Sequence, residues 1–290
     1  MSTFAIHDSE MLQVIEHALR EDIGAGDITT DSIIPKNKLG KAIFIAKANG
    51  VLAGLEAAET VFALIDESLR WKKILRDGMP VLRGATIATV EGNLASMLKG
   101  ERVALNFMQR MSGIATMTSM FVRLTEGTKA KIADTRKTAP GLRAFDKWAV
   151  RLGGGQNHRF GLDDMILIKD NHIAAAGNIE NAVAAVLGRQ PIERKIKIEV
   201  ECDTLSQVSE ALGCEGIDII MLDNFSPDHM ETAVKMIRAK RRDIAIEASG
   251  NVNEHTVRDI AEAGVDLISV GALTHSVKAL DISMEIEEKR

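Results

Sequence analysis

Tyrosine is absent from this 290-residue chain, and aromatic residues make up only 3% of it. Proteins that hold single-stranded nucleic acid stack its bases on aromatic side chains, so this scarcity argues against such a surface. Long apolar runs are missing too. Stretches such as residues 42–46 and 217–222 are bounded by Lys or Asp, far short of the roughly eighteen apolar residues of a membrane span. No membrane helix is expected.

Cysteine is scarce as well. Cys202 and Cys214 show neither CxxC spacing nor neighbouring ligands, which argues against a disulfide framework or a zinc site and favours two small buried side chains. The chain contains no GxGxxG or GxxxxGK[ST] motif to indicate a Rossmann or P-loop site. Its N-terminus lacks the basic-then-apolar layout of a signal peptide, so a cytoplasmic location is expected.

The charge that is present is unevenly distributed. The chain carries a net charge of −5, yet the stretch from Lys129 to Lys169 contains nine Lys and Arg residues and only four Asp residues. A protein that binds nucleic-acid phosphates usually spreads its positive charge over a whole domain. This basic stretch in an acidic chain therefore predicts a concave site for a small ligand with several negative charges.

The length predicts either one large barrel or two domains. Apolar periodicity behind Ser9 predicts a first helix that ends at Gly24, and residues 26–31 have the composition of a loop. Strands are expected at residues 41–47 and 71–75, with a helix over residues 55–66 between them. A long helical pattern over residues 94–124 contains Ser112-Gly113, where we expect a break or kink. The first ninety residues thus resemble an α+β module.

Beyond Gly127 the chain alternates short apolar strands with helices, which is typical of βα units around a parallel sheet. Six such units can be counted. Polar residues follow the strands, at the edge where βα barrels build their active sites. Those we expect to converge there are Arg136, Lys137, Lys169, Glu201, Asp223 and Ser249. The pattern decides only weakly between an open sheet and a barrel.

Several blocks together resemble the quinolinate phosphoribosyltransferase family, and they occur in register from about Asp22 to Ile282. They are residues 101–110 (ERVALNFMQR), 134–143 (DTRKTAPGLR), 153–159 (GGGQNHR), 168–172 (IKDNH), 199–201 (EVE), 222–225 (LDNF), 247–251 (EASGN) and 270–275 (VGALTH).

This resemblance implies an α/β architecture: an N-terminal α+β sandwich domain followed by an incomplete βα barrel of fewer than eight strands. We expect the sandwich domain over residues 1–112, the barrel over residues 113–275, and a segment over residues 276–290 that packs back on the N-terminal domain. The family also implies a homodimer, in which Arg102 reaches the neighbour's site. By pattern alone, Arg102 would be a solvated helix charge.

The implied reaction transfers phosphoribosyl from 5-phosphoribosyl 1-pyrophosphate to quinolinate, with decarboxylation to nicotinate mononucleotide in NAD biosynthesis. Arginine forks suit the two carboxylates of quinolinate. The expected substrate-binding residues are Arg102, Arg136, Lys137, His158, Arg159, Lys169, Glu201, Asp223, Ser249, Gly250, Asn251, Gly271 and Ala272. Of these, Lys137, Lys169, Glu201 and Asp223 are the expected catalytic group. Glu201 and Asp223 would also approach Mg2+ indirectly, through substrate and water.

Other interpretations stay open at this point. Helix capping is a serious rival role for Ser249 and Gly271. Five further polar residues are equally suited to supporting the binding residues rather than touching the ligand: Asp134, Asn157, Asn171, His172 and Asn224. Three alternative functions also remain: a relative acting on a monocarboxylate such as nicotinate, a lyase with Lys137 or Lys169 as Schiff-base nucleophile, and a catalytically silent anion-binding protein.

Period-2 alternation places Glu199 and Glu201 on the same side of one strand, and position at the strand end favours Glu201 as the ligand contact.

Overall fold

A computed structural model describes residues 9–189 and 196–287. The chain divides into two compact units. Unit 1 comprises Met1–Ser119, Thr138–Gly154 and Leu273–Arg290, and unit 2 comprises Met120–Lys137 and Gly155–Ala272. Each unit is therefore assembled from separate stretches of chain, whereas the sequence suggested three continuous ranges that divide at residues 112 and 275.

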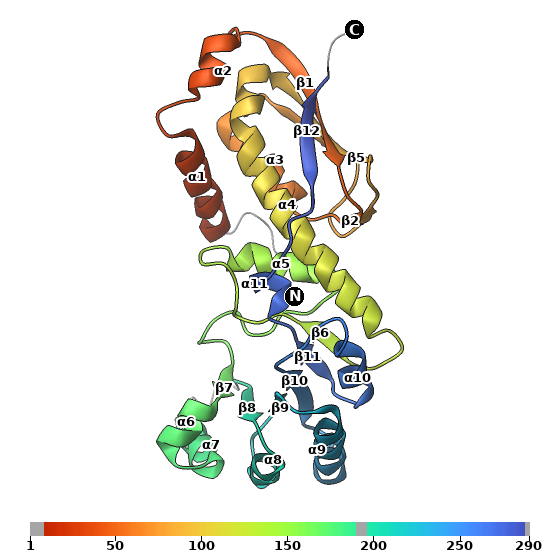
Figure 1. Cartoon of the computed structure of the whole chain (residues 1–290). Helices are drawn as coiled ribbons and strands as arrows, with labels where there is room; N and C mark the ends of the chain where they lie inside the picture. The colour runs from red at the N-terminus through yellow and green to blue at the C-terminus, as the bar shows by residue number, and fades with distance from the viewer. Residues whose placement is uncertain (1–8, 190–195, 288–290) are drawn as a thin grey trace. The chain divides into compact units, whose positions relative to one another are not determined.

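Unit 1 contains an antiparallel sheet with the strand order β12-β1-β5-β3, of which β12, β1 and β5 are labelled in Figure 1. Its C-terminal strand β12 pairs with β1 near the start of the chain, Phe44 opposite Met284. Phe44, Phe62 and Trp71 pack ring against ring in its core. Its elements are α1 (Ser9–Ile23), α2 (Ile28–Ile33), β1 (Leu39–Ala46), β2 (Gly50–Val51), α3 (Leu55–Ile65), β3 (Arg70–Lys73), β4 (Pro80–Val81), β5 (Thr86–Asn93), most of α4 (Leu94–Leu124), α5 (Arg143–Leu152), most of α11 (Ala272–His275) and β12 (Ile282–Ile286).

Two predictions for this unit were wrong. Residues 26–31 are not only a loop, because α2 begins at Ile28 with the Asp27 side chain accepting a hydrogen bond from the Thr30 N–H. This helix escaped prediction since Ile28 and Ile33 are exposed and give no apolar face. The expected break at Ser112-Gly113 is also absent: α4 is one helix of 31 residues.

Gly113 serves close packing rather than a kink. A Cβ atom at this position would fall well inside contact distance of the Lys278 backbone oxygen and would also meet Val277 and Ala279. The Ser112 hydroxyl beside it donates to the Ala53 carbonyl and accepts from the Ala53 N–H. The small residues therefore let two other segments of unit 1 approach the helix.

Replacing Gly113 by Ala is expected to destabilise the protein despite the better helix propensity of Ala. Overpacking against backbone costs about 1–3 kcal/mol, against a helix gain of about 1 kcal/mol. Gly188→Ala is the matched control, since Gly188 has φ −68° and an added Cβ would meet nothing closer than 3.4 Å. Thermal midpoints measure both variants. A midpoint for Gly113→Ala at or above that of Gly188→Ala would contradict the close-packing role.

Unit 2 is a parallel sheet of six strands in the order β6-β11-β10-β9-β8-β7. The strands are β6 (Lys131–Ala133), β7 (Ile166–Ile168), β8 (Ile198–Cys202), β9 (Ile219–Asp223), β10 (Ala245–Ser249) and β11 (Leu267–Ser269). Their continuous apolar runs fit strands that are covered on both faces. Among the described residues no pairing joins β6 to β7, so the barrel is not closed. The prediction of six βα units and fewer than eight strands is confirmed.

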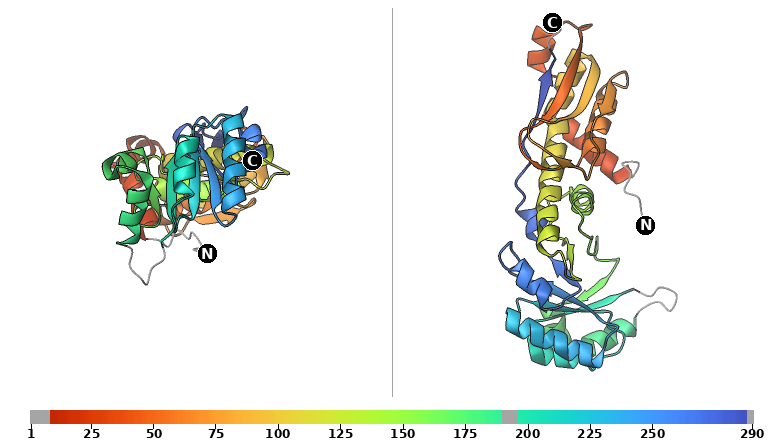
Figure 2. Two further views of the ribbon diagram at one scale, coloured as in Figure 1. Left: turned by 90° about the horizontal axis from the view of Figure 1, so that it is seen from below. Right: turned by 90° about the vertical axis from the view of Figure 1, so that its right-hand side faces the viewer.

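The helices of unit 2 follow the strands as expected: α7 (Ile179–Leu187), α8 (Leu205–Ala211), α9 (Pro227–Lys240) and α10 (Val257–Glu262), with an additional α6 (Asp170–Ala176). Asn178, Thr204 and Ser226 cap three of them with side-chain hydrogen bonds. Neighbours α7, α8 and α9 lie along one face of the sheet (Figures 1 and 2). Both cysteines are buried in this unit as predicted.

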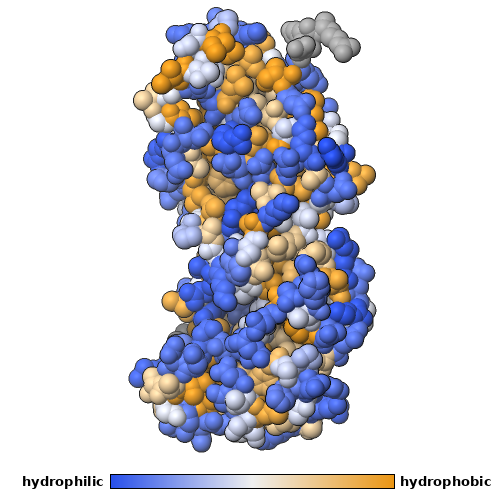
Figure 3. All heavy atoms as spheres, viewed as in Figure 1, coloured by the Kyte–Doolittle hydropathy of each residue, from blue (hydrophilic) through white to orange (hydrophobic). Residues whose placement is uncertain are grey.

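Two further observations concern the helices and the surface. In the described part of the chain, no helix combines the length and the apolarity that crossing a membrane requires. The face drawn in Figure 3 is largely hydrophilic, with hydrophobic residues in separate patches.

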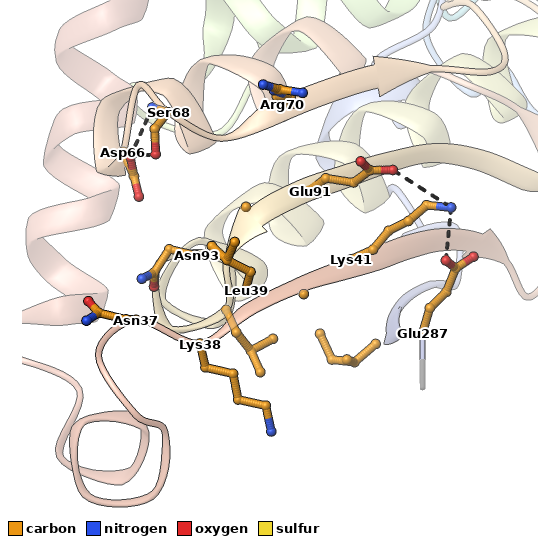
Figure 4. A pocket seen from close by; sticks show the side chains of 14 residues that line it. Asn37, Lys38, Leu39, Lys41, Asp66, Ser68, Arg70, Glu91, Asn93 and Glu287 are labelled. Carbon is orange, nitrogen blue, oxygen red and sulfur yellow. Dashed lines mark hydrogen bonds and ion pairs between the residues drawn. The ribbon is translucent and has the colours of Figure 1, made fainter. Parts of the chain in front are cut away.

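A hollow of about 1310 Å³ in unit 1 contains none of the predicted site residues. It lies at the ends of β1 and β5, where Lys41 reaches Glu287 at 2.9 Å and Glu91 at 3.9 Å (Figure 4).

Candidate functional site

The carboxyl ends of the unit 2 strands carry the predicted residues. Lys137 follows β6 and Lys169 follows β7, while Glu201, Asp223 and Ser249 lie at the ends of β8, β9 and β10. Asp223 and Ser249 are directly opposite each other in the register of β9 and β10. Because the strands are parallel, all these side chains belong to one edge of the sheet.

Two arginines at this edge lie close enough to affect each other. Burial, and then the charge of Arg136, lower the pKa of Arg159 from its ordinary value. The Arg136 Nε atom is buried and has no hydrogen-bond partner in the part of the chain that the structure describes. Arg159 is anchored by donating from Nη1 to the Met165 carbonyl at 3.1 Å. Two neighbouring guanidinium groups, one with an unused donor, form a site prepared for an anion.

His158 lies against two buried carboxylates. Its Nε2 atom is 3.0 Å from a Glu199 oxygen and 3.3 Å from a Glu247 oxygen, and Ser269 donates to the other Glu247 oxygen at 2.5 Å. Burial alone would lower the pKa of His158, but the two carboxylates outweigh it and raise that pKa to about 10. Burial raises the pKa of Glu199 to about 7. The imidazole is therefore a fixed cation at neutral pH.

The His158 cluster makes stability depend on pH in one direction. The stabilisation from His158 is complete below its unfolded pKa of about 6.5 and is lost as the pH rises through about 10. Glu199, with a folded pKa of about 7, also holds its proton more tightly when folded. We therefore expect the thermal midpoint to fall between pH 6 and pH 10. The fall should be clearly shallower in a Glu199→Gln/Glu247→Gln variant, and parallel curves would contradict this account.

The end of β8 is occupied by an acidic group with one cation. Lys169 Nζ lies 2.6 Å from Glu201, while Glu201, Asp203 and Asp223 bring carboxylate oxygens within 4.8 Å of one another. Burial, then the charge of Asp223, raises the pKa of Asp203 above its ordinary value. Such an all-oxygen set has the chemistry that Mg2+ prefers. Sequence reasoning did not select Asp203, although it follows Glu201 by two residues on the same strand end.

Supporting residues surround these groups. The fully buried Asp134 carboxylate accepts from the His158 N–H at 3.0 Å and from the Asn157 amide at 2.5 Å, which fixes the start of the His158 segment. His172 accepts from the Lys169 N–H at 3.0 Å. Asp163 and Asp164 are consecutive acidic residues, a pattern that resembles a pair of metal ligands. In the structure the Asp164 carboxylate accepts a hydrogen bond from the Phe160 N–H in a loop.

The structure also shows what the sequence could not select. Glu247 lies within the otherwise apolar strand β10 and is fully buried. A charged residue inside an apolar run was the only sign in the sequence that it has a special role. Glu199 contacts His158 while Glu201 contacts Lys169, so the two glutamates of β8 have different partners. Gly250, Asn251, Gly271 and Ala272 follow β10 and β11 at the same edge. Arg102 belongs to unit 1, where it is exposed on α4.

Comparisons with known proteins agree over nearly the whole chain. Residues 27–112 match the model of the quinolinate phosphoribosyl transferase N-terminal domain, and residues 114–285 match that of the C-terminal domain. A probable nicotinate-nucleotide pyrophosphorylase [carboxylating] of Synechocystis sp. is 46% identical over 94% of this chain and 91% of its own length.

The protein of the same description from Bacillus subtilis is 44% identical, with 96% and 93% covered. The crystal structure of nicotinate-nucleotide pyrophosphorylase from Ehrlichia chaffeensis superposes with a TM-score of 0.89 at 40% identity, covering 95% of this chain and 98% of that one.

Proposed function

Because the chain belongs to the quinolinate phosphoribosyl transferase family, we propose that it transfers the phosphoribosyl group of 5-phosphoribosyl 1-pyrophosphate to quinolinate. The products are nicotinate mononucleotide, pyrophosphate and carbon dioxide, which makes the protein a pentosyltransferase of NAD biosynthesis. The observation that carries the proposal is the pair of neighbouring guanidinium groups of Arg136 and Arg159. Among the described residues the buried Arg136 Nε has no hydrogen-bond partner, and the His158 imidazole next to Arg159 in the sequence is held by Glu199.

Quinolinate is a planar dianion, and this cationic group matches it. A guanidinium fork binds a carboxylate through two parallel hydrogen bonds, so Arg136 and Arg159 take one carboxylate each or share one. His158 adds a fixed positive charge, held by Glu199 and Glu247. Lys137 completes the set as a further cation after β6. Glu201 holds the Lys169 ammonium group in an ion pair at 2.6 Å.

Phosphoribosyl pyrophosphate is assigned to the carboxylates and to the loops after β9, β10 and β11. Asp223 and Glu201 accept from the ribose hydroxyls and stabilise the positive charge that develops at C1 as pyrophosphate leaves. The backbone N–H groups of Ser249, Gly250 and Asn251, and those of Gly271 and Ala272, bind the 5′-phosphate.

The chemistry then follows in two steps. The ring nitrogen of quinolinate attacks C1, and the bond from C1 to the pyrophosphate oxygen breaks. The ring now carries a formal positive charge on nitrogen, so the bond from C2 to its carboxylate breaks with the electron pair left on C2. Carbon dioxide departs and C2 takes up a proton. Fixed cations from Lys137, Lys169 and His158 stabilise the electron density at C2.

Mg2+ suits the Glu201, Asp203 and Asp223 oxygens, and when bound it neutralises the charge of the departing pyrophosphate. Asp203→Asn is expected to raise the Mg2+ concentration needed for half-maximal activity by about three- to tenfold, since one ligand charge is lost. Thr204→Ala, which removes the capping hydroxyl of α8 but no carboxylate, serves as the control. A Mg2+ dependence in Asp203→Asn equal to that of the control would remove Asp203 from the metal's surroundings.

Assembly and location complete the proposal. We assign a homodimer in which Arg102, exposed on α4, contributes to the partner's quinolinate site. A cytoplasmic location fits an enzyme of pyridine nucleotide synthesis whose described residues contain no membrane-spanning helix. The partners are thus the two substrates and a second copy of the chain, with neither nucleic acid nor membrane.

Substrate choice tests this proposal against the nearest alternative. The kcat/KM values for quinolinate and nicotinate are measured with phosphoribosyl pyrophosphate and Mg2+. A site built for two carboxylates leaves cations unpaired when one carboxylate is missing, so quinolinate is expected to be preferred by about a thousandfold or more. Equal or better use of nicotinate would move the assignment to a transferase for monocarboxylates.

A further inference from the structure

The ends of β9 and β10 share an unusual backbone feature. Asn224 has φ 56° and Asn251 has φ 52°, and among the described residues these are the non-glycine residues with positive φ. Left-handed backbone is uncommon for residues that carry a side chain, although Asn tolerates it better than most. Each follows a strand that ends in a predicted ligand contact, Asp223 on β9 and Ser249 on β10.

The two asparagines are joined to each other and to those contacts. Asn224 Nδ2 donates to Asp223 Oδ2 at 2.6 Å, and Asn224 Oδ1 accepts from Asn251 Nδ2 at 2.9 Å. The Asn224 N–H also donates to the Ser249 carbonyl at 2.9 Å. The Asn224 amide therefore uses both its ends to link the carboxylate of one strand to the turn after the next.

Gly250 explains why this link is close. Its φ is 84°, and a Cβ atom there would fall well inside contact distance of the Asn224 side chain. The turn can thus lie directly on the amide only because residue 250 has no side chain. The Asn251 carbonyl is held in turn by Asn253 Nδ2 at 3.3 Å and by the Thr256 hydroxyl at 3.2 Å.

We propose that Asn224 is a positioning residue that sets Asp223 and the Ser249–Asn251 turn relative to each other, and so shapes the subsite for a ribose 5-phosphate group. This inference rests on the proposed function for the identity of that group. With Oδ2 held by the amide, Asp223 presents Oδ1 to the ribose hydroxyls, and the turn presents its N–H groups to the phosphate. One side chain thereby fixes the distance between the two ends of the ligand.

A purely conformational role for Asn224 predicts a different outcome from a positioning role. Glycine adopts positive φ without strain, so Asn224→Gly keeps the backbone and removes only the amide. We expect its KM for phosphoribosyl pyrophosphate to rise about ten- to a hundredfold, the range for losing a hydrogen bond to a charged group. The KM for quinolinate should change less than about threefold, with a thermal midpoint near that of the wild type.

Two further variants sharpen the test. Asn224→Asp keeps the shape but faces Asp223 with a second carboxylate, so its KM for phosphoribosyl pyrophosphate should exceed that of Asn224→Gly. Asn251→Gly should show a smaller rise, and the double variant Asn224→Gly/Asn251→Gly should be no worse than Asn224→Gly alone, since Asn251 acts through Asn224. Unchanged KM in Asn224→Gly, or equal losses for both substrates with a lowered midpoint, overturns the positioning role.

Activity of the wild-type protein distinguishes a failure of this inference from a failure of the proposed function. If the wild type forms no product, the proposed function fails, and binding of ribose 5-phosphate by calorimetry then decides the inference. A dissociation constant about ten- to a hundredfold higher in Asn224→Gly than in the wild type supports it. Equal affinity of the two proteins for ribose 5-phosphate overturns it.

Discussion

Arg136→Ala is expected to lower kcat/KM for quinolinate by three orders of magnitude or more while the fold survives. In the proposed site Arg136 offers a charge-assisted fork to a carboxylate, and its buried Nε has no hydrogen-bond partner among the described residues. Truncation should therefore remove a ligand contact without breaking a hydrogen bond of that atom.

Arg136→Lys is the matched control for this effect. Lysine keeps the charge but not the planar fork, so it should recover only part of the loss. Thermal midpoints of both variants should stay close to that of the wild type, because the Arg136 Nε makes no hydrogen bond among the described residues and its charge lies near that of Arg159. Near-normal turnover of Arg136→Ala would exclude Arg136 from the quinolinate site.

Mixing two inactive variants is expected to restore activity if sites are shared between subunits. In the proposed homodimer, Arg102→Ala would lack the cation that reaches the partner's site, and Lys169→Ala would lack a cation of its own site. In a two-fold dimer of one subunit of each kind, one site carries both defects and the other carries neither. Purified heterodimers should therefore show about half the wild-type specific activity.

As controls, each inactive variant is taken alone through the same unfolding, mixing and refolding as the heterodimers. These controls should remain inactive. Heterodimers that stay inactive, with their composition verified by two affinity tags, would contradict a site completed by Arg102. They would leave Arg102 as the solvated helix charge that its exposure on α4 suggests.

The strands and their polar ends were predictable because parallel buried strands carry continuous apolar runs. All six strands of unit 2 appear where the runs lie, and the side chains that follow them share one edge. Helices without a buried face were not predictable: α2 exposes Ile28 and Ile33, and α6 has no buried residue. The spacing of apolar residues reveals a helix only when one of its faces is buried. These two helices therefore show no such spacing in the sequence.

Some residues of the candidate site could likewise be predicted from the sequence, and others could not. Arg136, Lys169, Glu201 and Asp223 stand at strand ends, a position that a sequence shows directly. The pairing of His158 with Glu247 joins residues 89 positions apart, and only the fold brings them together. The link between Asn224 and Asn251 depends on two left-handed residues, which composition does not reveal. The role proposed for Arg102 requires a second chain, so the sequence pattern of one chain cannot indicate it.

The most direct test of the central claim follows both products of the reaction at once. Purified protein is incubated with phosphoribosyl pyrophosphate, Mg2+ and quinolinate labelled in the 2-carboxylate, and nicotinate mononucleotide and labelled carbon dioxide are measured together. This account predicts equal amounts of the two throughout the reaction. Folded protein that forms neither product, or that forms a nucleotide with the label retained, would contradict it.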